Sequence, residues 1–404
     1  MATVSLVLFA LTYAGIAIGR IPGLALDRTG FALLGAVAFL ALGLLDLESA
    51  KAAVDAPTIV VLFGMMLLSV QYQLSGLYTA IGDRLARTAD RKRLLAGTIV
   101  VTAGLSAILT NDVVCFALTP LVASALRRTR MDPLPFLFAI ACASNLGSAL
   151  TPIGNPQNIL IAQKLDLQFL PFVLACAAPV VLSLGFLYWF LSRRLPDREG
   201  DAPGPVVPLP PPVPLDRPEA AKALVLTAAA VVLFLVPTVP TYLTALAIGG
   251  VVLTSRRMHT RSMLALVDWH MLALFAGLFV VIRGVEDAGW TVRAAGALRS
   301  SGADLSSPLV YVPSVIVLGN LVGNVPAVML MLPFISRSPT VGYGLALSST
   351  LAGNAFLVGS VANLIVAEQA ERLGIPIRFG AHLRVGLPVA AFSLIVAAAF
   401  MALW

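Results

Sequence analysis

Charge is scarce in this chain. Only 12% of its 404 residues are Asp, Glu, Lys or Arg, whereas 59% are hydrophobic and the mean hydropathy is +0.93. A soluble domain carries about twice that share of charged residues, and so few charges would not cover the surface of a large soluble protein. Apolar runs of about twenty residues recur, long enough to cross a hydrocarbon core of about 30 Å. The composition therefore predicts an all-α polytopic membrane protein.

Cysteine and histidine are also rare, at three residues each. Cys115, Cys142 and Cys176 lie inside apolar segments without the spacing of metal ligands, so we expect buried free thiols. An intramembrane hydrolase needs paired acids or metal ligands, and the sequence has neither an HExxH motif nor a second acid in the middle of a span. We therefore expect no enzyme activity, no catalytic residue and no cofactor.

The net charge of +7 does not indicate a nucleic-acid partner, because the basic residues gather in a few loops. Lysine and arginine accumulate in the cytoplasmic loops of membrane proteins. If the N-terminus lies outside, 21 of the 27 Lys and Arg residues fall on the inner side. We therefore predict a multi-pass protein of the inner or plasma membrane, embedded in the lipid bilayer, with its N-terminus outside.

The first 194 residues contain three spans and then an unusual apolar run at 94–126. This run is interrupted by Thr110-Asn111-Asp112 and has basic clusters on both flanks. Its 33 residues are too many for one span and too few for two. A simple crossing would also place one basic cluster outside. We therefore predict a re-entrant hairpin that enters from inside and turns near mid-membrane at these three residues.

The next apolar segment, 135–162, is interrupted between Ser144 and Asn158. This stretch contains Pro152 and Pro156, each of which removes a backbone donor and breaks a helix. In a membrane protein, backbone that is not helical is tolerated only where it is buried in protein or lines a watery cavity. We therefore predict a broken transmembrane helix here, followed by a span at 169–191.

The second half, residues 219–404, repeats this plan after a proline-rich cytoplasmic linker at 195–218. An outer hairpin is predicted at 309–335 and a second broken helix at 345–367. Because the second half starts from the opposite side of the membrane, the repeat is inverted. Inverted repeats with broken helices are typical of secondary transporters with a site near mid-membrane.

The four interruptions form the candidate substrate and ion site. Unwound backbone frees N–H and C=O groups, and helix N-termini direct positive dipole ends toward a bound solute. A Na⁺ ion, which prefers oxygen ligands, is predicted near Asn111, Asp112 and Gly154. The candidate residues are Thr110, Asn111, Asp112, Asn145, Thr151, Gly154, Asn155, Asn158, Gly323, Asn324, Asn354, Gly359, Ser360 and Asn363.

Asp112 is the one acid in the middle of an apolar segment. A carboxylate there is costly unless it is paired, protonated or bound to a cation, which favours a role in coupling transport to H⁺ or Na⁺. The alternative is a structural cap that accepts backbone N–H bonds at the start of the returning helix. Arg283, near the end of its span, is expected to snorkel or to pair locally with Asp287.

The chain resembles the ion transporter superfamily, which includes arsenite permeases, sodium/proton antiporters and divalent-anion/sodium symporters. It is most similar to the anion permease branch related to arsenite permease. The match follows the order of elements along essentially the whole chain. The segments that carry it are 107–120, 144–158, 320–326 and 353–363.

This resemblance implies a scaffold, a transport unit of two hairpins and two broken helices, elevator-type motion, and a homodimer. It also implies that substrate lies between the hairpin tips. The tips here are Thr-Asn-Asp and Gly-Asn-Val, whereas the symporters have Ser-Asn-Thr in both halves, and Phe356 replaces a small hydroxyl residue. These differences favour proton coupling or a single cation site.

Two functions follow from these observations. The first is secondary active transport of a small anion or an arsenite-like oxyanion, coupled to H⁺ or Na⁺ through Asp112. The alternative is a Na⁺/H⁺ antiporter of the same superfamily, in which Asp112 binds the transported cation.

Overall fold

The computed structural model describes residues 1–19, 23, 25–88, 90–128, 131–195, 213–300 and 304–403. Within these residues every regular element is a helix. The helices of the first half are α1 (Ala2–Ile18), α2 (Arg28–Ala41), α3 (Leu47–Ala53), α4 (Ala56–Leu74), α5 (Leu77–Ala86), α6 (Arg91–Ile108), α7 (Asn111–Arg128), α8 (Leu134–Ser148), α9 (Pro156–Lys164) and α10 (Phe169–Ser192).

The second half is helical in the same way. Its helices, including two 3-10 turns, are α11 (Arg217–Phe234), α12 (Thr241–Leu253), α13 (Thr260–Ala265), α14 (Trp269–Asp287), α15 (Trp290–Ser300), α16 (Pro308–Val322), α17 (Asn324–Met331), η1 (Leu332–Phe334), α18 (Pro339–Ala352), η2 (Leu357–Gly359), α19 (Val361–Arg372) and α20 (Phe379–Met401).

Aspartate starts many of these helices. An N-cap aspartate accepts a hydrogen bond from a backbone N–H in the first turn, which satisfies one of the donors that a helix start leaves free. Six helices in the described part begin in this way, and their caps are Asp27, Asp46, Asp55, Asp90, Asp216 and Asp268. Much of the chain's limited acidic charge is thus used to begin helices.

Four helices in the described part are long and apolar enough to cross a membrane: α4, α10, α14 and α20. Shorter apolar helices, among them α1, α2, α8, α12 and α16, accompany them. The helical content and these apolar spans agree with the predicted all-α membrane protein.

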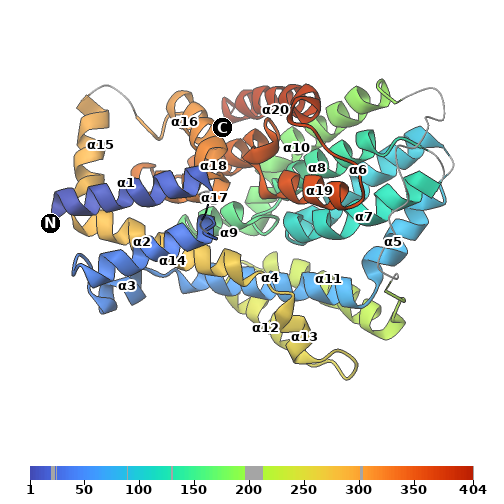
Figure 1. Ribbon diagram of the computed structural model, residues 1–404, viewed down its shortest axis with the longest axis horizontal. Helices are drawn as coiled ribbons and strands as arrows, with labels where there is room; N and C mark the ends of the chain where they lie inside the picture. Colours follow the sequence, from blue (N-terminus) through green and yellow to red (C-terminus); the bar gives the residue numbers. More distant parts are fainter. Residues whose placement is uncertain are drawn as a thin grey trace.

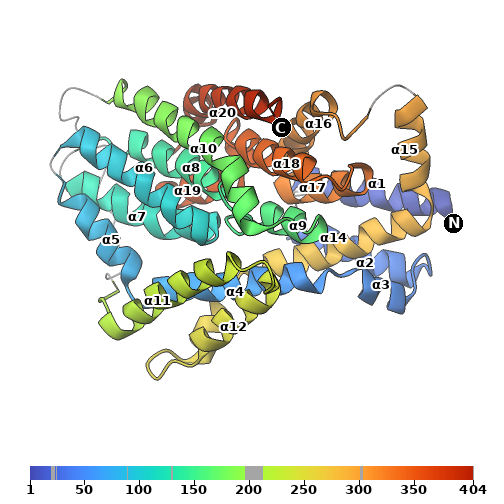
Figure 2. The same cartoon turned by 180° about the vertical axis from the view of Figure 1, so that it is seen from behind.

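The helices form groups along the long axis of the molecule (Figures 1 and 2). α1, α2 and α14 pack together at the end that holds the N-terminus, whereas α6, α7 and α8 pack near the opposite end. α4, α11 and α12 form a third group along one side. α4 and α12 approach closely at Gly64, where a Cβ would collide with the carbonyl of Ala245.

Each predicted interruption falls between two helices. Residues 109–110 separate α6 from α7, and Gly323 separates α16 from α17. Residues 149–155 separate α8 from α9, and residues 353–360, which include η2, separate α18 from α19. Three of the four interruptions contain glycine, whereas the one between α6 and α7 consists of Leu109 and Thr110.

Two regions contain helices that hydropathy does not reveal. In the acidic stretch after Leu45, Asp46 caps a short helix, α3. In the basic region between residues 76 and 93, the chain is divided into separate helices. Gly76 adopts a positive φ of 73° and divides α4 from α5, and Asp90 caps a new helix that begins at Arg91. In both places an aspartate cap starts a helix that hydropathy alone does not show.

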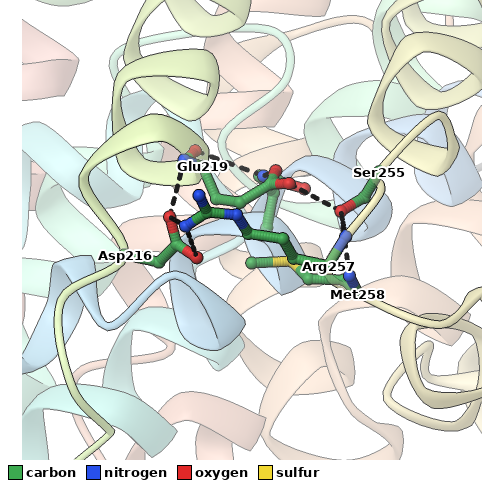
Figure 3. A network of polar contacts seen from close by, with 6 residues as sticks. Asp216, Glu219, Ser255, Arg257 and Met258 are labelled. Atoms are coloured by element: carbon green, nitrogen blue, oxygen red, sulfur yellow. Dashed lines mark hydrogen bonds and ion pairs between the residues drawn. The ribbon is translucent and has the colours of Figure 1, made fainter.

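Most of the proline-rich linker, residues 196–212, lies outside the described residues, but its end at 213–216 is described. Asp216 caps α11 and accepts hydrogen bonds from Arg257 at 2.8 and 2.9 Å. Glu219 is buried and accepts from Gln71 at 2.7 Å and from Ser255 at 2.6 Å (Figure 3). This network attaches the start of the second half to α4 and to the loop after α12.

Candidate functional site

One cavity of about 80 Å³ lies where all four interruptions meet. The first residues of α7, α9, α17 and α19 all line it. Helix N-termini carry partial positive charge and free N–H groups, so four of them around one cavity favour a bound anion. The predicted site residues that line this cavity are Asn111, Asp112, Gly323, Asn324, Gly359 and Ser360.

The break between α8 and α9, residues 149–155, is hydrogen-bonded directly to the turn between α6 and α7. The N–H of Asn111 donates to the carbonyl of Gly154 at 3.2 Å. The hydroxyl of Thr151 donates to the carbonyl of Ala107, in the last turn of α6. Only glycine fits at position 154, because a Cβ there would collide with the carbonyl of Ser148. The two interruptions of the first half therefore form one rigid unit.

The break between α8 and α9 and the break between α18 and α19 share a hydrogen-bond pattern. The side-chain amide of Asn158 donates to the carbonyls ten and seven residues before it, at 3.2 and 3.0 Å. The amide of Asn363 does the same with the carbonyls ten and seven residues before it, at 2.8 and 3.1 Å. Each asparagine satisfies carbonyls that the unwound segment leaves free, so the breaks of the two halves are built alike.

Asn145 joins the two halves. Its carbonyl oxygen accepts from Asn111 at 3.2 Å and from Ser360 at 2.9 Å. Its amide nitrogen donates to Asn354 at 2.9 Å and to Asn363 at 3.1 Å. An asparagine side chain has two donors and two acceptor positions, so these partners saturate it. Asn145 thus holds the tip of the first half against the break of the second.

Thr350 of α18 makes a second connection between the halves. Its hydroxyl accepts from Asn155 and Gln157, both at 3.2 Å, and donates to Asn158 at 3.3 Å. Asn155 also caps α9 by accepting from the N–H of Asn158 at 2.9 Å. Thr350 was not among the predicted residues, because its run of small polar residues in an apolar helix has no breaker to mark it.

Several buried polar atoms around the cavity have no hydrogen-bond partner among the described residues. They are Oγ1 of Thr110, Oδ1 of Asn111, Oδ1 of Asn324 and Nδ2 of Asn354. Leaving such an atom unsatisfied costs about 1–3 kcal/mol. Of these residues Asn111 and Asn324 line the cavity, so a solute or ion bound there would complete the hydrogen bonding of their two side chains.

Asp112 differs from the six capping aspartates. It lines the cavity and is partly buried. Among the described residues no hydrogen bond or ion pair to its carboxylate is found, and the alternative role as a cap therefore has no hydrogen bond behind it. A carboxylate without a partner beside a cavity is available to a proton or a cation.

Arg28 and His382 belong to the site but were not predicted. Arg28, at the start of α2, lines the cavity. His382 of α20 is buried and donates to the carbonyl of Asn354 at 3.1 Å. The sequence placed Arg28 among the loop charges of the inner side, where a basic residue at a helix end is ordinary. A histidine inside an apolar helix was the signal for His382.

The remaining predicted residues do not line the cavity. They are Thr110, Asn145, Thr151, Gly154, Asn155, Asn158, Asn354 and Asn363. Each is buried, and all except Thr110 belong to the hydrogen bonds described above, which hold the tips and breaks in place.

The oxygens around Asn111 and Asp112 suit a Na⁺ ion, which takes oxygen ligands. Oδ1 of Asn111 and the Asp112 carboxylate are free of partners, whereas the Gly154 carbonyl already accepts from Asn111. Within the described residues no group of three or more His, Cys, Asp or Glu side chains lies together.

Two predictions from outside the cavity are confirmed. The three cysteines are free and buried. Arg283 pairs with Asp287 at 2.8 Å, one turn further along α14.

Proteins similar in sequence are transporters. An uncharacterized transporter of Mycobacterium tuberculosis is 30% identical, with 99% of this chain and 98% of the relative covered. The silicon efflux transporter LSI3 of Oryza sativa is 28% identical over 91% of each chain. The inner membrane protein YbiR of Escherichia coli is 30% identical over 80% of this chain and 82% of its own.

Two solved transporters share the fold. The YdaH transporter of Alcanivorax borkumensis superposes with a TM-score of 0.59 at 15% identity, covering 100% of this chain and 98% of its own. MtrF of Neisseria gonorrhoeae superposes with a TM-score of 0.57 at 13% identity, covering 100% and 94%. Identities this low support the fold alone.

The family model described as CitMHS, citrate transporter, matches residues 7–343. This range is well over half of the chain, and the family lies within the superfamily that the sequence resembles. The chain therefore belongs to the citrate transporter family and is a multi-pass membrane transporter rather than an enzyme.

Proposed function

We propose that the chain is a secondary active transporter of a small anion or oxyanion. The observation that carries this proposal is the convergence of four helix N-termini on one cavity. Their dipoles and free N–H groups favour negative charge. The unsatisfied amide atoms at the two tips, Oδ1 of Asn111 and Oδ1 of Asn324, add acceptors for a hydroxyl group of the solute.

The size of the cavity favours a small solute. Its volume of about 80 Å³ is well below the roughly 300–1,000 Å³ of pockets that enclose drug-sized ligands. The family's name refers to citrate and the rice relative's name to silicon efflux. A compact, oxygen-rich solute agrees with both of these names.

Asp112 supplies the coupling in this proposal. Its carboxylate faces the cavity without a protein partner, so a proton or Na⁺ bound there would neutralise it before the loaded unit moves. Oδ1 of Asn111, which is unsatisfied and belongs to a residue that lines the cavity, adds an oxygen ligand for the sodium alternative.

The motion that we propose is an elevator. α6–α9 and α16–α19 would move as one unit, because Asn145 and Thr350 join their two halves. The helix pairs would be re-entrant hairpins of an inverted repeat, which the matching bonds of Asn158 and Asn363 support. The N-terminus would lie outside the plasma membrane, and two copies would pair through the scaffold.

A Na⁺/H⁺ antiporter is the second candidate. The free oxygens beside Asp112 favour it, because a carboxylate with amide and hydroxyl oxygens can hold Na⁺ and exchange it for a proton. In this function no anion would be needed.

Flux through purified protein in liposomes separates the two functions. Internal accumulation of citrate, sulfate, phosphate, arsenite and silicate would be measured under imposed pH and Na⁺ gradients. We expect at least one of these solutes to be moved. Movement of Na⁺ or Li⁺ against a pH gradient with every one of them absent would instead establish the antiporter and overturn anion transport.

A further inference from the structure

Arg28 brings a positive charge to the candidate site from outside the hairpins and broken helices. It is the first residue of α2 and directly follows the cap, Asp27. Its side chain lies against Gly323, the residue between α16 and α17, because a Cβ at position 323 would come within 3.2 Å of the Nη1 atom of Arg28. Gly323 also has a φ of 96°, a conformation that favours glycine.

The guanidinium has no protein partner to neutralise it. It is partly buried, and among the described residues no hydrogen bond or ion pair to Arg28 is found. Its neighbour Asp27 is occupied as the cap of α2 and lies 3.9 Å from His270. Among the described residues that line the cavity, Asp112 is the only other charged one.

The two charges sit on different parts of the molecule. Asp112 belongs to α7, which packs against α8 and α19. Arg28 belongs to α2, which packs against α1 and α14. If α6–α9 and α16–α19 move together past the other helices, Asp112 travels with the solute whereas Arg28 stays behind.

We propose that Arg28 binds the negative charge of the transported anion, and that it does so in only one of the two positions of the moving unit. This inference rests on the proposed function and gives the site two unequal states. In the conformation described here the anion is held by the helix N-termini and by Arg28. After the unit has moved, the helix N-termini hold it alone.

The chemistry of arginine makes this a contact for ionised oxyanions. Its planar guanidinium offers paired N–H donors that match a carboxylate, sulfate or phosphate edge, and hydrogen bonds between charged groups are stronger than neutral ones. A neutral solute would gain little from it. Arg28 thus selects for negative charge.

The experiment compares the apparent KM on the two sides of the membrane. Wild type, Arg28→Gln and Arg28→Lys would be reconstituted in liposomes. Each protein would carry an engineered surface cysteine, and a thiol reagent that cannot cross the membrane would inactivate the molecules that expose this cysteine to the outside. Transport would then be measured through the molecules of the opposite orientation. The probe is citrate, followed by each other anion of the flux panel that the wild type carries. Arg256→Gln, which removes an exposed arginine away from the cavity, is the matched control.

We expect Arg28→Gln to raise KM at least tenfold on one side and less than twofold on the other, with Arg28→Lys in between and Arg256→Gln unchanged. An unchanged KM on both sides, or an equal rise on both, would overturn the proposal. Melting curves with and without citrate would show that the variant is folded. If the wild type carries no anion at all, the proposed function itself fails, which is a different result from wild-type transport that Arg28→Gln leaves intact.

Discussion

Asn145 shows how a single buried amide organises this site. Its four hydrogen bonds connect Asn111 at one tip with Ser360, Asn354 and Asn363 at the opposite break. Because it is saturated, it has no capacity left for a solute. The atoms free to bind one are those at the tips, together with Asp112 and Arg28.

Replacing Asn145 with alanine should destabilise the protein strongly. The change would strand up to four buried polar groups, each of which costs about 1–3 kcal/mol when unsatisfied, and networks of this kind are not additive. We expect a fall of several degrees or more in the melting temperature of the purified protein in detergent. Ser393→Ala is the control, because the buried hydroxyl of Ser393 donates to the carbonyl of Ala390 within its own helix. Equal melting temperatures for both variants would contradict the role of Asn145.

The site residues show what a sequence can and cannot reveal here. Glycine and proline mark the breaks because they disrupt helices locally, so Gly154, Gly323 and their neighbours were predictable. Arg28 and His382 were missed, because only the tertiary fold brings them beside Gly323 and Asn354. Which amides face the cavity and which are saturated behind it depends on the same long-range packing.

At the scale of helices, the end of α9 is held to helices outside the proposed moving unit. Lys164 pairs with Asp55, the cap of α4, at 2.5 Å, and its amine lies 5.4 Å from the ring centre of Phe279. The neighbouring Gln163 donates to Thr241 of α12 at 2.7 Å. Movement of α9 relative to α4 would have to break these contacts.

The Lys164–Asp55 pair should contribute a modest coupling energy. Asp55 is 13% exposed and Lys164 40% exposed, so solvent screens the pair in part and we expect about 1 kcal/mol. A double-mutant cycle with Lys164→Gln, Asp55→Asn and both together, followed by thermal melting, would measure it. Additive effects of the two single changes would show that the pair contributes nothing.

Acid should weaken the attachment of α11. Hydrogen bonds from Arg257 hold the pKa of the Asp216 carboxyl below its usual range. A depressed pKa in the folded state stabilises the protein above the unfolded value of about 3.9, and this contribution is lost as the pH falls through the folded pKa. We expect the melting temperature to fall below about pH 4.

The variant Asp216→Asn isolates this contribution. Its melting temperature should depend less on pH between neutral pH and the acid range than that of the wild type. Glu371→Gln, which changes an exposed acid on α19, is the control and should follow the wild type. A pH dependence in Asp216→Asn as steep as that of the wild type would show that other carboxyl groups are responsible.

Across the whole molecule, scarce charge is divided between two tasks. Six aspartates begin helices, and many basic residues lie at helix ends, as Arg91, Arg217 and Arg372 do. Asp112 and Arg28 are different, because both line the central cavity and neither has a hydrogen-bond or ion-pair partner in the described part of the chain. The fold class, the interruptions and the family could be predicted from hydropathy, glycine, proline and motif order. The short helices α3, α13 and α15 could not, because their weak hydropathy gives no span.

The central claim is that Asp112 couples movement of an anion to a cation gradient. The most direct test is gradient-driven uptake of a carried anion into liposomes that contain either the wild type or Asp112→Asn. We predict that an imposed H⁺ or Na⁺ gradient drives accumulation by the wild type, while Asp112→Asn supports only exchange down the anion's own gradient. Accumulation by Asp112→Asn with the same dependence on pH and Na⁺ as the wild type would contradict the account.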